Sequence, residues 1–596
     1  MIFSGDFETT TCEPTSVWLF GLMDIMDHNY FIYGKSIREF FKYCYDTGNH
    51  TIFFKNLKFD GNFIISHLLI NGYTWCENKE KCTDRTFTTI IDSSGKFFSI
   101  TIYFKKSKNG KHTKKLTIYN SSNFFPNLSV EDIAKNFNLP IKKGTIDYDR
   151  HNIKCEITKE EIEYIKNDCQ IMAHALRTII NLDMKSVTIG ANAVKELKSI
   201  LGDKKFRAFF PTLTYDSDTK IRTAYRGGYN YLNPDYTNKN IGICISLDIN
   251  SMYAHIMYNE YLPYGVPLEF DGKYKFNSYY PLYIQHLRCI LKIKKNHLPT
   301  IQVKHIIEDF CPTEYILNSE NKIITLSLTN IDLQLLKKHY DVEIIDYLGG
   351  YMFKAKKNIF KEYIDKWNNI KMKAKENQDI ILYFISKLML NQLTGKFAKK
   401  PIIINQQPYL KNGKVKFART PPKETDSFYT AMAVFITSYG RNKIISTAQK
   451  IHSDSIKETG KSRFIYANTD SLHLIGDEVP EIIDINPVEL GKWKHEGIFY
   501  KARFLRPNQY IRYKFIEEYK EKKQNVKVIN YKEKKYIVQD DNTEFLPIIT
   551  CSGMSKKCYK NVTWKNFTYG TSYPGNLKPK TVKGGILLLP EDFTIL

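Results

Sequence analysis

The order of apolar and polar positions near the N-terminus predicts two strands and a helix. Residues 1–10 are typical of a strand, in which Asp6 and Glu8 point to the same face because they are two apart. A second strand is expected at 51–54, and Asp60 then stands near the start of a helix with recurring apolar positions. Like charges on one strand face repel each other unless a cation lies between them. Taken alone, however, Asp6 and Glu8 are better explained as an exposed strand edge.

A longer helix is predicted to begin at Thr158, which has the spacing of a capping box with Glu161. Tyr164 and Asp168 are four residues apart on this helix and therefore share a face. The simpler alternatives are an exposed acid for Asp168 and a core aromatic for Tyr164. Together with the earlier acids, Asp168 completes a set of four carboxylates that could meet in the fold.

Two further acids are expected to meet in the rest of the chain. Residues 241–247 alternate apolar with small side chains and predict a strand that ends at Asp248. Residues 464–474 predict a strand, a tight turn and a second strand, with Asp470 in the turn. Such a hairpin could place Asp470 opposite Asp248 across a sheet, where both could hold metal. The alternative for Asp248 is that it caps the turn that follows.

Between these acids, residues 380–400 have the pattern of an apolar helix with one polar stripe. The stripe is formed by Lys387, Asn391 and the pair Thr394–Gly395. Lys387 can be interpreted as a surface lysine whose stem covers apolar neighbours, or as a cation aimed at a triphosphate. Lys371, sixteen residues earlier, could supply a second cation.

Composition narrows the class of protein. The 596 residues are too many for one core and suggest about three to five folded units. Lys and Arg outnumber Asp and Glu by 87 to 63, which suits a polyanion such as nucleic acid, although a basic soluble surface would give the same excess. The 11 scattered cysteines are typical of reduced thiols in a cytosol. Asp6 interrupts the first apolar stretch, so no signal peptide is expected, and the run 586–589 is too short to span a membrane.

Three motifs in the first third of the chain occur in an order that resembles the DnaQ-like proofreading exonucleases; they are Asp6-x-Glu8, Asn56 to Asp60, and Tyr164-x3-Asp168. The resemblance implies a ribonuclease-H-like 3′→5′ exonuclease domain over residues 1–188, with two divalent cations held by Asp6, Glu8, Asp60 and Asp168. It also implies that Tyr164 orients the attacking water. The residues implied in gripping the 3′ end and the strand being proofread are Asn56, Phe59, Ser121 and Lys135.

The remaining motifs resemble those of the family B DNA polymerases, and their order and spacing agree over nearly the whole chain. The two palm motifs and the fingers motif correspond to Asp248-x2-Ser251-Met252-Tyr253, Tyr466-x-Asn468-Thr469-Asp470-Ser471 and Lys387-x3-Asn391-x3-Gly395. Two further motifs resemble those of the protein-primed subgroup from bacteriophages with linear genomes; they are Tyr225-Arg226-Gly227-Gly228 and Thr437-x2-Gly440-Arg441.

This resemblance implies a DNA-dependent DNA polymerase with two Mg²⁺ ions per active site, for which Mn²⁺ can substitute. The metal ligands would be Asp248, Asp470 and the carbonyl of Ile249, and the triphosphate would be held by Lys371 and Lys387. The other nucleotide contacts would be Tyr253, Asn391 and Thr394. The DNA contacts would be Tyr225, Gly227, Gly228, Thr437, Arg441 and Tyr510. The implied partners are a DNA primer-template, deoxynucleotides and a terminal protein that serves as primer, and the implied protein is a monomer that works in the host cytoplasm without a membrane.

The implied fold class is α+β and multidomain, an exonuclease domain followed by a right-hand polymerase with two insertions. The palm is expected in two parts, 189–260 and 429–540, with the fingers at 357–400 and the thumb at 541–596. An insertion at 261–356 would engage the terminal protein. A second insertion at 401–428 would support strand displacement and processivity. Its Asn412-Gly413 pair between alternating runs is a strong hairpin signal.

Four residues depart from the pattern of the family. Asn468 replaces the first Asp of the second palm motif, Thr394 a Tyr, Gln392 a Ser, and Asn508 the Lys of a Lys-x-Tyr motif. Three alternatives therefore stay open. They are a family B polymerase primed by nucleic acid, a DNA-binding replication scaffold without catalysis, and an exonuclease whose polymerase half has decayed.

Overall fold

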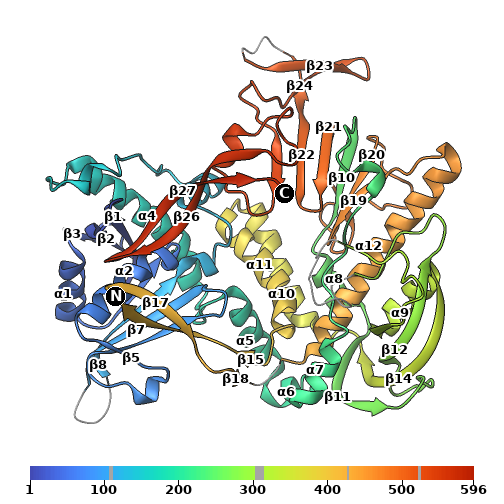
Figure 1. The fold of residues 1–596 in the computed structure, drawn as a ribbon, viewed down its shortest axis with the longest axis horizontal. Coiled ribbons are helices and arrows are strands. Elements are labelled where there is room, and N and C mark those ends of the chain that lie inside the picture. The colour runs from blue at the N-terminus through green and yellow to red at the C-terminus, as the bar shows by residue number, and fades with distance from the viewer. Residues whose placement is uncertain (107–111, 303–313, 426–427, 521–524) are drawn as a thin grey trace.

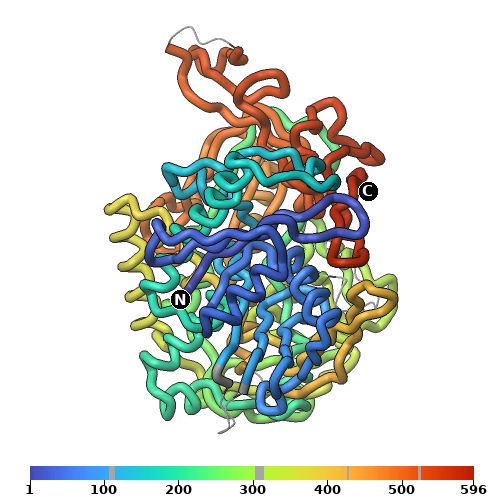
Figure 2. Tube along the Cα trace, turned by 90° about the vertical axis from the view of Figure 1, so that its left-hand side faces the viewer, coloured from blue at the N-terminus to red at the C-terminus, as the bar shows by residue number. Residues whose placement is uncertain are grey.

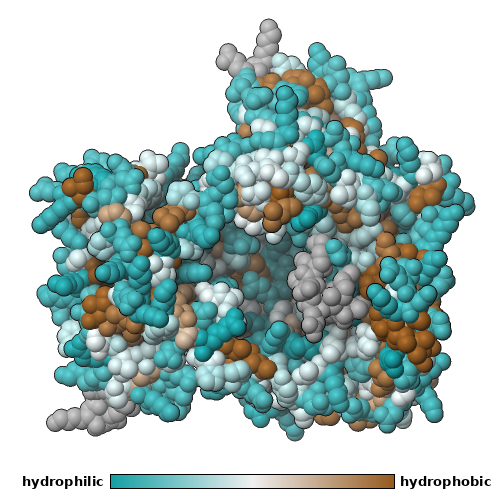
Figure 3. Space-filling view, viewed as in Figure 1, coloured by the Kyte–Doolittle hydropathy of each residue, from teal (hydrophilic) through white to brown (hydrophobic). Residues whose placement is uncertain are grey.

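The protein is represented by a computed structural model that describes residues 1–106, 112–302, 314–425, 428–520 and 525–596. Figure 1 shows its parts arranged around a central opening, and the space-filling view in Figure 3 shows this face hollowed at its centre. Parts of both expected insertions, 303–313 and 426–427, lie outside the described residues.

An eight-stranded sheet organises the N-terminal part of the chain, in the order β3-β2-β1-β4-β8-β7-β6-β5. The first strand, as expected, runs through Asp6 and Glu8, and it pairs antiparallel with β2 and parallel with β4. The capping box of Thr158 and Glu161 is confirmed at the start of the 23-residue helix α4. The strands are β1 (Ile2–Thr9), β2 (Val17–Asp24), β3 (Phe31–Gly34), β4 (His50–Phe54), β5 (Thr74–Trp75), β6 (Thr86–Ile91), β7 (Phe97–Lys106) and β8 (His112–Asn120), and the helices are α1 (Ile37–Thr47), α2 (Leu57–Ile70), α3 (Val130–Asn136) and α4 (Lys159–Asn181).

A nine-stranded sheet forms the second centre, with β10 between β20 and β21 and the order β23-β24-β22-β21-β10-β20-β19-β9, while β25 pairs with β22. The predicted strand at 241–248 begins later and ends one residue further on, because Ile241 makes only an isolated bridge to Ala502. The predicted hairpin around Asp470 is confirmed as β19 and β20. The strands are β9 (Asn230–Leu232), β10 (Cys244–Ile249), β19 (Phe464–Asn468), β20 (Ser471–Ile475), β21 (Trp493–Arg506), β22 (Gln509–Glu518), β23 (Lys527–Tyr531), β24 (Lys534–Val538) and β25 (Ile548–Cys551).

Helices pack against this sheet and extend away from it. The long helix α12 (Thr430–Thr459) contacts α8 (Met252–Asn259) and α11 (Ile380–Phe397), and α11 also contacts α10 (Lys361–Glu376) and α5 (Ile189–Leu201). These contacts bury apolar residues such as Met389, Leu390 and Leu393, which explains why the sequence of α11 is so apolar. The helix predicted at 380–400 ends three residues early. Two shorter helices, α6 (Asp203–Phe209) and α7 (Tyr215–Arg222), precede the sheet.

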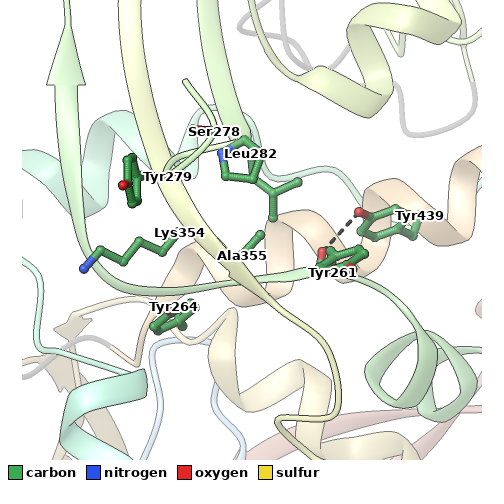
Figure 4. Close-up of a pocket in the computed structure, with 9 residues that line it drawn as sticks. Tyr261, Tyr264, Ser278, Tyr279, Leu282, Lys354, Ala355 and Tyr439 are labelled. Atoms are coloured by element: carbon green, nitrogen blue, oxygen red, sulfur yellow. Dashed lines mark hydrogen bonds between the residues drawn. The ribbon is translucent and has the colours of Figure 1, made fainter. Parts of the chain in front are cut away.

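The sequence between α8 and α10 folds into a separate sheet of four strands, in the order β11-β14-β12-β13, with α9 packed beside it. Its elements are β11 (Leu262–Phe270), β12 (Leu282–Ile293), β13 (Ile324–Thr329), α9 (Asn330–His339) and β14 (Tyr340–Lys356). A cavity of about 550 Å³ lies where this sheet meets α12, and Figure 4 shows Tyr261, Tyr279, Lys354 and Tyr439 around it. None of its lining residues is acidic, so it belongs to the junction between this sheet and α12 rather than to a carboxylate site.

The hairpin predicted at Asn412-Gly413 is confirmed between β16 (Gln406–Lys411) and β17 (Lys414–Arg419). Both turn residues have positive φ, 52° and 73°, as a two-residue hairpin loop of this kind requires. The short strands β15 (Ile402–Ile403) and β18 (Lys423–Glu424) pair at its base. The hairpin lies against the N-terminal unit, where Phe417 contacts Phe97 and Lys414 pairs with Glu13 at 3.4 Å.

The C-terminal hairpin of β26 (Ser572–Val582) and β27 (Gly585–Thr594) reaches back to the N-terminal unit. In Figure 1 these red strands lie over α2, whereas the β23–β24 hairpin projects from the top of the molecule in Figures 1 and 2. The amide of Thr15 donates to the carbonyl of Lys583 at 3.1 Å, and Lys556 pairs with Asp132 at 2.9 Å. The C-terminal part of the chain is thereby joined to the N-terminal unit.

The turn at Gly584 is predicted to tolerate no side chain. Its φ is 91°, and a Cβ there would come within 2.0 Å of the Thr15 carbonyl oxygen. Gly584→Ala should therefore lower the urea midpoint of unfolding by more than Gly570→Ala, because Gly570 also has positive φ but has nothing within 4 Å. The expected cost is on the order of 1–3 kcal/mol. Equal midpoints for the two variants would show that this contact does not hold the C-terminal hairpin.

Candidate active sites

Four acidic side chains from three elements face one another in the N-terminal unit. Asp6 and Glu8 come from the same face of β1, Asp60 from the first turns of α2, and Asp168 from α4. The exposed strand edge is therefore the wrong explanation for the first pair, because β1 is an inner strand and Glu8 is buried. Asp60 and Asp168 are buried as well. The sequence-predicted acids are thus brought together.

The electrostatics of this cluster favour protonated acids in the absence of a cation. Burial and the neighbouring Asp168 raise the pKa of Asp6 to about 7. Burial and the charge of Asp6 raise the pKa values of Glu8 and Asp60 well above their ordinary range. Within the described residues, the Oδ1 atoms of Asp60 and Asp168 are buried without a hydrogen-bond partner. Orphaned carboxylate oxygens in a like-charged cluster fit hard divalent cations.

Lys143 and Tyr148 join this cluster, and the sequence reasoning missed both. Lys143 donates to Oδ2 of Asp168 and lies 4.8 Å above the ring of Tyr164. The hydroxyls of Tyr148 and Tyr164 are 2.8 Å apart. Burial and the nearby Asp168 raise the pKa of Tyr164, so its hydroxyl remains a proton donor at neutral pH. No pattern in the sequence singles out these two residues, because both lie in an irregular loop without periodicity.

The residues expected to contact the DNA strand differ in their exposure. Asn56 is exposed in the left-handed region at the start of α2, and Phe59 is partly exposed against Phe63. Lys135 is exposed and lines a groove of about 430 Å³ that also includes Lys143. Ser121 is different, because it is fully buried and donates to the carbonyl of Phe54 at 3.1 Å. The expectation that the Ser121 side chain contacts DNA is therefore corrected.

In the nine-stranded sheet, neighbouring strands bring Asp248 and Asp470 together. Asp248 on β10 pairs in register with Ser471 on β20, directly after Asp470. The tight turn depends on Thr469, whose φ is 60°. The amide of Ile249 donates to the carbonyl of Asp470 at 2.8 Å, which fixes this peptide beside both acids. Burial and then the charge of Asp248 raise the pKa of Asp470 to about 7.

The strand β21, on the other side of β10, adds two charged residues that sequence reasoning missed. Nζ of Lys494 lies 2.7 Å from Oδ2 of Asp248. Glu496 accepts from the hydroxyl of Ser246 at 2.9 Å. Lys494 stands opposite Asp248 in the strand register, and register between distant strands cannot be obtained from the sequence alone.

Helices supply the cations expected to hold phosphates. Lys371 on α10 is buried, and its Nζ lies 3.5 Å from Oγ of Ser251, beside the end of β10. Burial and the charge of Lys387 lower the pKa of Lys371 to about 8, which shows that the two lysines share one region. Lys387 and Asn391 are both exposed on α11. Thr394 is not part of this stripe, because it is buried with its hydroxyl 3.7 Å from Sδ of Met257. The expectation that its side chain contacts the nucleotide directly is therefore corrected.

The motif around Gly227 is held by buried side chains from elsewhere in the chain. Arg441 donates to the carbonyls of Arg226 and Gly227 at 2.6 and 2.9 Å, and it pairs with Asp332 of α9 at 2.6 Å. Burial would favour a neutral acid, but Arg441 holds the pKa of Asp332 below its usual value. Gly228 in turn packs against Thr469, where a Cβ would lie 2.8 Å from that side chain. This chain of contacts links the first insertion to the turn that carries Asp470.

Some expected DNA contacts are consequently internal supports. Arg441 is 3% exposed and Thr437 is 3% exposed, with the Thr437 hydroxyl donating to the carbonyl of Ala433 at 3.0 Å. Neither side chain is presented to DNA, and this expectation is corrected. Gly227 has open space beside it, and Tyr225 is partly exposed, so both are accessible.

Tyr253 and Tyr510 take different positions in the palm. Tyr253 on α8 is partly exposed and packs at Gly440, where a Cβ would lie 3.1 Å from its ring. Burial raises the pKa of Tyr253, and the charge of Asp470 also raises it, which puts its hydroxyl near Asp470. Tyr510 is mostly buried in a ring cluster with Tyr466 and Phe504. A DNA contact from Tyr510 is limited to its 8% exposed surface.

Two of the residues that depart from the family pattern contact each other. The side-chain amide of Asn468 donates to Oδ1 of Asn508 at 3.2 Å, and the Asn508 backbone amide donates to the Tyr466 hydroxyl at 3.1 Å. Tyr466 also donates to Oδ1 of Asn230 at 2.8 Å. Asn468 therefore braces the β19–β20 hairpin against the turn that precedes β22. Gln392, a third departure, accepts from the Gly190 amide at 3.1 Å.

Within the described residues, no three or more His, Cys, Asp or Glu side chains are close enough to be recognised as a metal centre. The fit of the N-terminal set to cations therefore rests on its charge, burial and orphaned oxygens, and that of Asp248 and Asp470 on their charge and mutual repulsion. Among the same residues, every helix is too short or too polar to span a lipid bilayer.

Acids on an inner strand and its hairpin neighbour, faced by lysines from a helix pair, suit an enzyme that acts on nucleotide phosphates. The family described as DNA polymerase type B, organellar and viral, matches residues 42–486. The DNA polymerase of Bacillus phage phi29 is 39% identical over 100% of this chain and 99% of its own length. That of Streptococcus phage Cp-1 is 32% identical over 100% of this chain and 98% of its own length.

A solved structure confirms the likeness in three dimensions. The phi29 DNA polymerase complexed with primer-template DNA and incoming nucleotide substrates has a TM-score of 0.87 and 38% identity, and 100% of each chain is covered. The chain belongs to the type B DNA polymerase family and is a DNA-directed DNA polymerase. The resemblance to phage polymerases and the expected α+β multidomain fold class are thereby confirmed.

Asn468 is predicted to support the palm hairpin and Asp470 to be essential. Asp470→Ala should eliminate single-nucleotide incorporation, because it removes one of the two palm carboxylates. Asn468→Ala should lower the rate by only about tenfold or less, equivalent to about 1.4 kcal/mol of barrier. Asn508→Ala should lower the rate by at least as much, because it removes the same hydrogen bond and the one from the Tyr466 hydroxyl, at a position of positive φ that disfavours Ala. An Asn468→Ala enzyme as inactive as Asp470→Ala would instead make Asn468 part of the catalytic centre.

Proposed function

We propose that this polymerase replicates a linear viral or plasmid genome by protein priming and proofreads its product with a separate 3′→5′ exonuclease site. The observation that carries the proposal is the presence of two sets of like-charged, buried or partly buried acids on different sheets. One set is Asp6, Glu8, Asp60 and Asp168, and the other is Asp248 and Asp470. Two separate sets would allow the phosphodiester bond to be formed at one site and hydrolysed at the other.

At the polymerase site, each residue has a distinct proposed role. Asp248 and Asp470, with the Ile249 carbonyl beside them, would hold two Mg²⁺ or Mn²⁺ ions. Divalent cations at either carboxylate set would lower the pKa of the attacking hydroxyl or water and neutralise phosphate charge. Lys371 and Lys387 would bind the phosphates of the incoming nucleotide, and Tyr253 would pack under its sugar. The low pKa of Lys371, about 8, makes an anion a strongly favoured neighbour.

At the exonuclease site, the tyrosine pair and Lys143 would position the attacking water. The Tyr164 hydroxyl can donate to it, while Tyr148 orients that hydroxyl. Lys143 offsets the charge of Asp168 and would stabilise charge that develops on the phosphate. Asn56, Phe59 and Lys135 would hold the strand that enters along the groove beside Lys143.

The remaining expected units fit the same proposal. The sheet at 262–356 would receive the terminal protein, and the β16–β17 hairpin with the C-terminal hairpin would close around DNA and support strand displacement. The contacts of Phe417 with Phe97 and of Thr15 with Lys583 support this closure. The phi29 polymerase has been solved with primer-template DNA and nucleotides, and we propose the same partners here. The protein would act as a monomer in the host cytoplasm.

The two activities are predicted to be separable. Asp6→Ala with Glu8→Ala should abolish degradation of single-stranded DNA and leave primer extension within about twofold, because these acids lie on a different sheet from Asp248. Asp248→Asn should do the reverse and reduce incorporation by several orders of magnitude. Both rates should be measured on one 5′-labelled substrate with Mg²⁺.

The reciprocal design also tests the alternatives. Parallel loss of both activities in either variant would contradict two independent sites. A wild-type enzyme that degrades DNA but never extends a primer would support an exonuclease with a decayed polymerase half. Initiation on DNA primers with none on a terminal protein would support the polymerase primed by nucleic acid.

The β16–β17 hairpin is predicted to be needed for strand displacement. Replacement of residues 407–418 by a short Gly-Ser linker should spare the filling of a short gap and reduce extension through a downstream duplex by about tenfold or more. The reason is its proposed place beside the point where the DNA strands part, which its docking against the N-terminal unit supports. Gap filling by the same enzyme is the control. Undiminished displacement would remove the hairpin from this role.

A further inference from the structure

Lys494 is the charged residue nearest to Asp248 for which the polymerase motifs provide no role. It faces Asp248 directly across the β10–β21 ladder, and its Nζ lies 2.7 Å from Oδ2 of that acid. The side chains of Lys494 and Asp248 are 31% and 15% exposed. The pair is therefore neither a fully solvated surface contact nor a sealed core ion pair, and it can open.

The surroundings of Lys494 make its ammonium group compete with a metal ion for the carboxylates of Asp248 and Asp470. Asp248 and Asp470 repel each other, as the raised pKa of Asp470 indicates. Either an ammonium or a divalent ion can relieve that repulsion, but their like charges oppose binding of both to the same carboxylate oxygen. Lys494 also acts on Lys371 by like-charge repulsion, so several positive groups converge on one small anionic centre. Glu496 lies on the same strand but is engaged by Ser246.

We propose that Lys494 is an internal counter-ion of Asp248 that a divalent cation must displace before it can bind. The inference rests on the proposed role of Asp248 as a metal ligand. Lys494 then keeps the acid pair compensated in the enzyme without nucleotide and weakens its affinity for metal. Removing its charge should tighten metal binding, which is the opposite of what a supporting residue would do.

The test measures Mn²⁺ binding without DNA or nucleotide, by electron paramagnetic resonance. The enzyme carries Asp6→Asn with Asp168→Asn, so that binding at the exonuclease site is suppressed. Lys494→Met keeps the stem and removes the charge, and it should bind Mn²⁺ about tenfold more tightly, as expected for loss of one close charge in a partly solvated site. Lys494→Arg should stay within about twofold of the parent enzyme, because it keeps the charge.

Lys492→Met is the matched control, because Lys492 pairs with Asp484 two positions before Lys494. It should leave the dissociation constant for Mn²⁺ unchanged. Unchanged or weaker binding by Lys494→Met overturns the proposal. Asp248→Asn separates this from failure of the proposed function. If it abolishes Mn²⁺ binding while Lys494→Met does not tighten it, only the role of Lys494 is wrong; if it leaves Mn²⁺ binding intact, Asp248 is not a metal ligand.

Discussion

Repulsion between carboxylates that are buried or partly buried is the constraint on which both candidate sites depend. Four acids converge from β1, α2 and α4, and two more converge from β10 and the turn before β20. Burial removes the water that would otherwise screen them, so each ionised acid destabilises its neighbours. The fold holds them together nonetheless, through inner strands and helices with apolar cores. Such a cluster of acids is stable when a cation or a proton neutralises its negative charge. In catalysis with divalent ions, the neutralising species is the cation.

The rest of the architecture can be read as support for these two centres. Lys143 and Lys494 each offset one acid, Asp168 and Asp248 respectively. The buried pair of Arg441 and Asp332 connects the first insertion to the turn beside Asp470 through the carbonyl of Gly227. At the other side of the opening, the hairpins join the N-terminal unit. The sites are thus separate in chemistry but are carried by one continuous framework.

Local patterns were enough to predict the elements that carry the acids. The two-residue spacing of Asp6 and Glu8, the capping box at Thr158 and the turn at Asp470 are all encoded within a few residues. Burial and strand register could not be predicted from local sequence, because they depend on strands and helices far apart in the chain. For that reason Ser121, Thr437 and Arg441 were expected at a DNA surface although they are buried. Lys494 was missed for the same reason, since only the β10–β21 register places it opposite Asp248.

The most direct test of this account is the pH dependence of thermal unfolding with and without metal. The pKa of Asp6 is raised from 3.8 to about 7, so the folded protein holds a proton that the unfolded chain releases, and stability should fall as pH rises from about 4 to about 7. In EDTA, the melting temperature of the wild type minus that of Asp6→Asn should fall over that pH range. The amide of the variant does not titrate, so the difference reports on the Asp6 carboxyl. Saturating Mn²⁺ should abolish this fall. A difference that is independent of pH in EDTA, or unaffected by Mn²⁺, would contradict the claim that cations compensate these acids.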